Sequence, residues 1–129
     1  MTTVVSQQTL RTPLGAFTDG VTDDRGRINV RRLAHALDLP MTTIAPALGF
    51  KPRWLNENPT GQNVQPKAVM LLETANELAA ALGGKKYVVL YLKTVQPDFK
   101  GETAADQLRK GRLNFLRGYV NEVVTLRPD

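Results

Sequence analysis

The sequence predicts an all-α fold, a small multi-helix domain, on three observations. Apolar residues recur at helical spacing in several segments of the 129-residue chain, most clearly in the Ala- and Leu-rich stretch after Pro66. Pro and Gly residues stand where these segments begin and end. The one β-prone segment, residues 87–95, has no evident second strand to pair with, so we assign it to a helix.

Residues 1–28 are predicted to form a flexible N-terminal arm. Thr, Gln, Gly and Asp dominate it, and residues 23–26 are typical of a turn. Such a terminus is poorly ordered unless something ties it down. In the alternative, its apolar residues dock on a partner or pack a short helix against the core. These residues are Val4, Val5, Leu10, Leu14 and Phe17.

Three short helices are predicted within residues 29–61. Asn29 is placed as an N-cap for the first, and the Leu39-Pro40 step ends it. The second helix ends at Gly49, and Pro52 occupies the first turn of the third. Two short helices joined by a tight, glycine-containing turn have the layout of a helix-turn-helix.

Residues 62–126 are predicted to form a second helical domain. A long amphipathic helix begins at Pro66 and ends at Gly83-Gly84. Thr103 and Asp106 have the spacing of a capping box, which opens a short helix over residues 104–109.

The chain ends in an amphipathic helix. Apolar residues at Leu113, Leu116, Val120 and Val123 recur at helical spacing. Pro128 is expected to terminate this helix.

Composition restricts the chemistry of the chain. The absence of cysteine excludes disulfides and thiolate sites and fits a reducing compartment, so we expect a cytoplasmic protein. No His or Cys cluster has metal-ligand spacing, and no cofactor is expected. No apolar run approaches the ~20 residues that span a bilayer, and the first twenty residues lack the apolar core of a signal peptide, so no membrane association is expected.

The residues also argue against an enzyme. The only histidine, His35, is expected on an exposed helix surface, and the only serine, Ser6, lies in the arm. The Gly83-Gly84-Lys85-Lys86 run lacks Walker spacing and is better explained as a helix C-cap. Glu73 and Glu77 share a helix face and are expected to be solvated charges.

The predicted helix-turn-helix is a candidate DNA-binding site. Lys51 and Arg53 stand at the start of the recognition helix, which is the third of the three short helices and begins at Pro52. The start of a recognition helix meets the major groove, and Asn56 is placed to reach bases or phosphates. Seventeen basic and twelve acidic residues give a net charge of +5, which permits an anionic partner without establishing one.

Two residues weigh against DNA contact. Glu57 repels phosphates, and Pro46 costs ~3 kcal/mol in a helix interior outside the first turn. A structural three-helix cap without DNA contact is therefore the alternative. Trp54 and Leu55 are expected in the core in either case.

Several motifs occur in a fixed order along residues 28–126. They are Arg32-Leu33-Ala34 to Leu37, Ile44-Ala45-Pro46-Ala47-Leu48-Gly49, Trp54-Leu55, the long helix ending Leu82-Gly83, Tyr91-Leu92-Lys93-Thr94, and Gly101-Glu102-Thr103-Ala104-Ala105-Asp106-Gln107-Leu108. This order resembles the antitoxins of the Xre/MbcA/ParS family, which join an Xre-like helix-turn-helix to a C-terminal toxin-binding domain. Ala104 departs from the family pattern, which usually has proline there, and residues 96–99 only approximate the family's turn.

The resemblance implies an antitoxin of a type II toxin–antitoxin pair that covers the active site of a RES-domain toxin, an enzyme that attacks NAD or transfers ADP-ribose. Because such a toxin holds an anionic dinucleotide, an invading Arg or Lys can occupy the same electrostatic niche. The candidate toxin-binding residues surround one loop: Glu102, Asp106, Arg109, Lys110, Gly111 and Arg112. The alternative is an ordinary solvated loop.

The resemblance also implies that residues 29–61 can bind operator DNA, and residues 62–126 then serve for dimerisation and toxin binding. A homodimer is expected because two-fold symmetry suits palindromic half-sites. The alternative function is a stand-alone helix-turn-helix transcriptional regulator whose C-terminal helices only dimerise.

Overall fold

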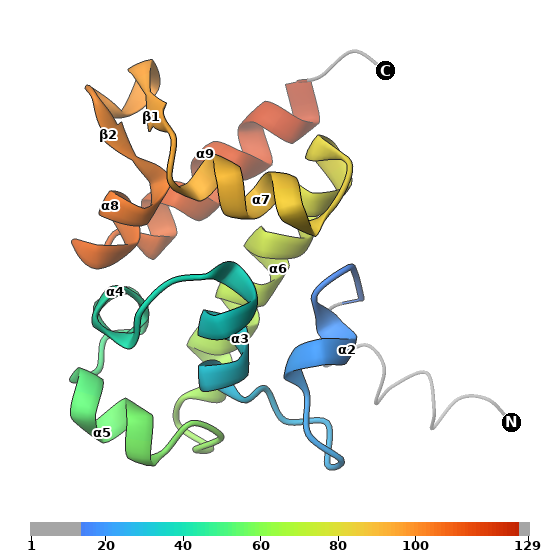
Figure 1. Cartoon of the computed structure of the whole chain (residues 1–129), viewed down its shortest axis with the longest axis vertical. Coiled ribbons are helices and arrows are strands. Elements are labelled where there is room, and N and C mark those ends of the chain that lie inside the picture. Colours follow the sequence, from blue (N-terminus) through green and yellow to red (C-terminus); the bar gives the residue numbers. More distant parts are fainter. Residues whose placement is uncertain (1–13, 127–129) are drawn as a thin grey trace, which may run out of the picture.

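A computed structural model describes residues 14–126, with side chains as far as Val124, and confirms the all-α class. In this part of the chain there are eight α-helices, one short 3-10 helix and one two-stranded sheet (Figure 1). The elements are α2 (Thr18–Val21), α3 (Val30–Leu37), α4 (Met41–Leu48), α5 (Pro52–Glu57), α6 (Gln65–Leu82), α7 (Lys85–Leu92), β1 (Val95–Gln96), η1 (Pro97–Phe99), β2 (Glu102–Thr103), α8 (Ala104–Arg109) and α9 (Leu113–Leu126).

The helix ends follow from local side-chain and backbone chemistry. The Asn29 side chain accepts hydrogen bonds from the first free N–H groups of α3, at 3.0 and 3.2 Å. Gly49 ends α4 in the left-handed conformation, with φ of 86°. Pro52 begins α5, where its missing N–H costs nothing. These ends are confirmed as predicted.

Helix α6 is the centre of the packing, and Figure 1 shows it running through the middle of the molecule. It packs against α7 and α9, while α8 packs against α4. Ile44 of α4, Leu72 of α6 and Leu108 of α8 belong to one buried hydrophobic cluster. Residues 29–61 and 62–126 therefore share a single core, and α8 is held in a fixed place relative to the three short helices.

Residues 14–28 are not the poorly ordered arm that the sequence predicts. Phe17 is buried, and its N–H donates to Asn76 Oδ1 of α6 at 2.9 Å. Gln65, also on α6, accepts from the N–H of Ile28 at 2.8 Å and donates to its carbonyl oxygen at 2.9 Å. Asn76 and Gln65 of α6 thus provide hydrogen-bond partners for the backbone groups of Phe17 and Ile28. Val4, Val5, Ser6, Leu10 and Pro128 lie outside the described residues.

The segment 87–95 is only partly helical. Helix α7 ends at Leu92, and the next residues form β1, in which Val95 pairs with Thr103 and Gln96 with Glu102 in antiparallel register. The expectation that no second strand is available was wrong. Two-residue strands leave no hydrophobic period in the sequence, so the pattern could not show them.

The hairpin is anchored by aromatic packing. Phe99, in the η1 turn between the strands, is buried and meets the rings of Phe115 and Tyr119 edge to face, with centroids 5.8 and 4.9 Å apart. The Tyr119 hydroxyl donates to Asp98 Oδ2 at 2.6 Å. The β1–β2 hairpin is therefore fixed to α9.

Candidate functional site

The six predicted toxin-binding residues come together around α8 and are called the α8 cluster below. Helix α8 starts with the predicted capping box. Thr103 Oγ1 accepts from the Asp106 N–H at 3.0 Å, and Asp106 Oδ2 accepts from the Thr103 N–H at 2.9 Å. The cluster is thus built on a helix whose beginning is fixed by side-chain hydrogen bonds.

Both carboxylates of the α8 cluster pair within the chain. Lys110 Nζ binds Glu102 Oε2, and Arg109 Nη2 lies 2.7 Å from Asp106 Oδ1. The hydrogen bond from Lys110 lowers the pKa of Glu102, and the Thr103 N–H, followed by Arg109, lowers the pKa of Asp106. Both groups are therefore ionised at neutral pH.

Arg112 differs from the other two basic residues of the cluster. Its side chain is exposed and has no carboxylate partner among residues 14–124. Gly111 precedes it with φ of 77°, and a Cβ on this glycine would lie 3.5 Å from the Pro46 carbonyl oxygen of α4. The turn that presents Arg112 therefore depends on glycine.

Gln107 organises the cluster and was missed in the sequence. Its side chain is 2% exposed, and Nε2 donates to Glu102 Oε1 at 2.9 Å and to the Thr103 carbonyl oxygen at 3.2 Å. The Gln107 main-chain carbonyl oxygen accepts from the Arg112 N–H at 2.8 Å, and Gln107 Oε1 accepts from Arg112 Nη1 at 3.4 Å. The signal was its place beside Leu108 on the buried face of α8, where a polar side chain needs partners.

The charges of the α8 cluster are suited to an anionic group. Three basic and two acidic side chains leave one positive charge in excess, and within the described residues Arg112 is the basic side chain of the cluster without an ion pair. A guanidinium binds carboxylate or phosphate oxygens through parallel hydrogen bonds. The geometry therefore offers one exposed arginine, without a carboxylate partner among the described residues, on a rigid support.

The predicted DNA-binding residues share the surface of α5. Lys51, Arg53 and Asn56 are exposed, and Arg53 Nε lies 3.7 Å from Glu57 Oε2. Figure 1 shows α4 between α5 and α8, so the α5 surface and the α8 cluster are separate.

Trp54 lies at this surface, which corrects the expectation that it is core. Its side chain is 37% exposed and stacks on Phe50 with 5.0 Å between ring centroids. Leu55 is buried as expected. Pro46 lies inside α4 beyond the first turn, the position at which a proline lowers the stability of a helix.

His35 is exposed on α3, as expected. It borders a hollow of about 390 Å³ together with Arg31 and Arg32. The Glu73 side chain is 40% exposed, as expected of a solvated charge, and it forms a surface ion pair with Arg117 of α9 at 2.9 Å.

Among the residues that the structure describes, no three His, Cys, Asp or Glu side chains are grouped so as to hold a metal ion. None of the helices in this range has the length and hydropathy needed to cross a membrane. A comparison with known proteins found no matching family model, no matching curated protein and no matching solved structure.

Proposed function

We propose that this chain is the antitoxin of a type II toxin–antitoxin pair, which binds a RES-domain toxin through the α8 cluster and covers its active site. The observation that supports this is Arg112, an exposed arginine without a carboxylate partner in the described chain, held by the backbone of buried Gln107. Such preorganisation lowers the entropy that a binding loop loses on association. The motif order along residues 28–126 supports the same proposal.

In this proposal Arg112 binds an acidic group of the toxin beside the active site, and the α8 cluster covers the active-site entrance. Arg109 and Lys110 keep their own acidic partners and surround this contact. Electrostatic complementarity of this kind speeds encounter and fixes the orientation of the complex.

The test is co-expression with the product of the adjacent gene, followed by co-purification and a growth assay. Arg112→Ala should weaken neutralisation, and substitution of Arg109, Lys110 and Arg112 together should restore toxicity while circular dichroism stays native. The matched control is Arg25→Ala, which removes another exposed arginine. Full neutralisation by the triple variant would show that the toxin binds elsewhere.

DNA binding through α5 is the second candidate, and it covers both autorepression and the stand-alone regulator. It is favoured by the joint exposure of Lys51, Arg53, Asn56 and Trp54 on one short helix and its cap. Gel-shift titration with the upstream promoter should give affinity that falls steeply with salt. Lys51→Ala with Arg53→Ala should abolish the shift, whereas Arg25→Ala should leave it intact.

A homodimer remains part of both proposals. Sedimentation equilibrium measures the oligomeric state directly, and a monomer at all concentrations would exclude the homodimer.

A further inference from the structure

A hollow of about 390 Å³ lies between α2 and α3, and it is called the α2–α3 hollow below. One residue of α2, the N-cap residue of α3 and four residues of α3 itself line it. They are Gly20, Asn29, Arg31, Arg32, His35 and Ala36. None of these residues belongs to α5 or to the α8 cluster. The volume falls within the roughly 300–1,000 Å³ of ligand pockets.

Three of the six lining side chains are basic, and none of the six is a carboxylate. Arg31 and His35 are four residues apart on one face of α3, and Arg32 is three residues before His35. All three residues are exposed. A guanidinium carries five N–H donors, and an imidazole carries at least one in either charge state. The α2–α3 hollow therefore gathers hydrogen-bond donors and positive charge in one concave place.

The nearby acidic residues do not neutralise these arginines by direct contact. Asp23, in the loop after α2, pairs with Arg27 at 3.1 Å. Asp38, which follows α3, pairs with Lys93. Two further acids of this region are exposed and form no ion pair with α3 in the part of the chain that the structure describes: Asp19 and Asp24. The two arginine charges are therefore available to a ligand.

The backbone holds Arg32 in place. Arg32 Nη1 donates to the Thr22 carbonyl oxygen at 3.3 Å, and Thr22 is paired with Ile28 in an antiparallel bridge. This one bond leaves most of the N–H donors of the guanidinium available. The backbone N–H groups of Arg31 and Arg32 already donate to the Asn29 side chain. The groups on offer in the hollow are therefore side chains and not the helix terminus.

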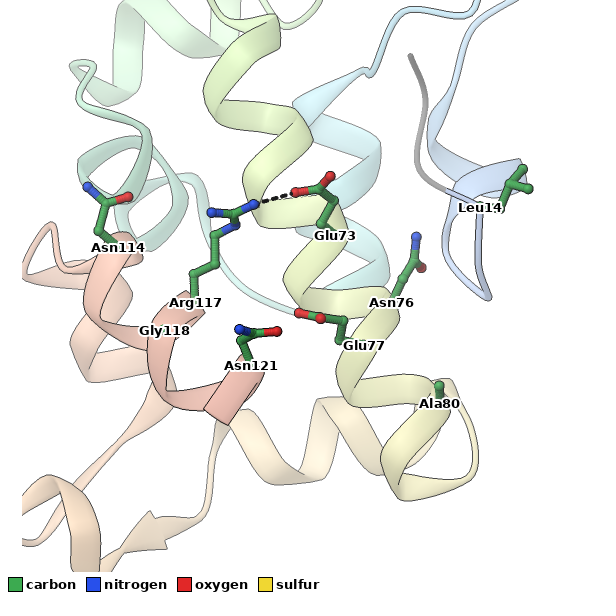
Figure 2. Close-up of a pocket in the computed structure, with 9 residues that line it drawn as sticks. All are labelled: Leu14, Glu73, Asn76, Glu77, Ala80, Asn114, Arg117, Gly118 and Asn121. Carbon is green, nitrogen blue, oxygen red and sulfur yellow. Dashed lines mark hydrogen bonds and ion pairs between the residues drawn. The ribbon is translucent and has the colours of Figure 1, made fainter. Parts of the chain in front are cut away.

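The larger hollow between α6 and α9 differs in charge (Figure 2). It measures about 730 Å³, and its one basic lining residue, Arg117, pairs with Glu73 at 2.9 Å. Glu77 lines it as a second acid. Among the lining residues described, the acids thus outnumber the bases. An anionic ligand is matched by the α2–α3 hollow and not by this one.

We propose that the α2–α3 hollow binds the phosphate group of a small phosphorylated compound, with Arg31 and Arg32 on the phosphate oxygens and His35 donating a further hydrogen bond. Guanidinium groups suit phosphate because they form parallel hydrogen bonds to two oxygens. Gly20 and Ala36 add little side-chain bulk, so room remains for the group esterified to the phosphate. A concave site of this volume is typical of small ligands. This inference goes beyond the antitoxin proposal and does not depend on it.

Titration of the full-length, ¹⁵N-labelled chain with inorganic pyrophosphate at low ionic strength tests the site. The amide signals of Arg31, Arg32 and His35 should move along saturable curves, whereas sodium chloride at equal ionic strength should not move them in this way. Arg31→Ala and Arg32→Ala should each weaken pyrophosphate binding about tenfold, because each removes hydrogen bonds to a charged group. Arg25→Ala, at an exposed arginine outside the hollow, is the control and should bind like the parent.

Filling the hollow tests its shape separately from its charge. A Cβ at Gly20 would meet nothing within 4 Å, so no described neighbour opposes a larger side chain there. Gly20→Leu should abolish the saturable shifts although both arginines remain. Gly118→Leu is the matched control, because Gly118 is also helical, a Cβ there would also meet nothing within 4 Å, and it lies outside this hollow. It should bind pyrophosphate like the parent.

Two results would overturn the proposal at once: no saturable shift in the parent chain, or parent-like affinity in both arginine variants. A duplex oligonucleotide that moves the same amide signals while pyrophosphate does not would also overturn it, because the arginines would then belong to a nucleic-acid surface. Parent-like binding by Gly20→Leu would remove the hollow as the site. No toxin takes part in these titrations, so their failure leaves the antitoxin proposal untouched.

Discussion

At the scale of single residues, the hydrogen bonds of Gln107 determine the shape of the α8 cluster. Its buried side-chain amide donates to Glu102 of the hairpin and to the Thr103 carbonyl oxygen at the helix cap, and it accepts from the Arg112 guanidinium in the following loop at 3.4 Å. Removing a buried hydrogen-bonding group leaves its former partners unsatisfied. The position therefore controls stability and the placement of the exposed arginine together.

We predict that Gln107→Leu lowers the free energy of unfolding by about 1–3 kcal/mol, because it keeps the volume and deletes the hydrogen bonds. Urea denaturation measures the change. Gln62→Leu is the control, since Gln62 is exposed. Equal midpoints for Gln107→Leu and the parent would contradict the assigned role.

The Tyr119 hydroxyl gives a prediction for alkaline pH. Its hydrogen bond to Asp98 raises the pKa of Tyr119 from 10.0 to about 12. A pKa that is higher in the folded state means that this stabilisation is complete below pH 10 and is lost as the pH rises to about 12.

Stability measured across that window should therefore fall in the parent protein and fall less in Tyr119→Phe. Some dependence remains in the variant, because burial also raises the pKa of Tyr91. Identical pH profiles for parent and variant would exclude a contribution from the Tyr119 hydrogen bond.

At the scale of elements, α8 is stabilised at its start by Thr103. We predict that Thr103→Ala lowers the free energy of unfolding by about 1 kcal/mol, as for other N-cap hydroxyls. Thr103→Ser keeps the hydroxyl and should remain close to the parent. Chemical denaturation with both variants checks this, and an equal loss in both would assign the effect to the methyl group instead.

Local chemistry made most helices predictable. Asn29, Gly49, and the Thr103 and Asp106 pair act on backbone groups within three or four residues, so their effect can be recognised in the sequence. The six residues of the α8 cluster came from the family resemblance, and because they lie within residues 102–112 they also come together in the structure.

Other features depend on distant partners and could not be predicted. The ordering of residues 14–28 rests on Asn76, 59 positions from Phe17, and the exposure of Trp54 depends on which side of α5 other helices cover. Gln107 was missed because its burial, not its spacing, gives it three partners.

At the scale of the whole molecule, the packing of α4 on α8 predicts a single cooperative unfolding transition. Trp54, the only tryptophan, reports on α5 by fluorescence, and circular dichroism reports on all helices. Leu108 is fully buried in α8, so Leu108→Ala should cost about 2–5 kcal/mol.

Both probes should shift to the same new midpoint in Leu108→Ala, although the substitution is in α8 and the fluorophore in α5. Leu90→Ala, at a 64% exposed position, is the control and should shift neither. Two separate midpoints would show that residues 29–61 and 62–126 fold independently.

The contact between α4 and α8 also limits how such a chain can be recombined. A chimera that takes its first sixty residues from one sequence and the remainder from another inherits two halves of an interface from different sources. Grafting a new specificity onto this scaffold therefore requires the facing surfaces of both helices to be transferred as a matched set.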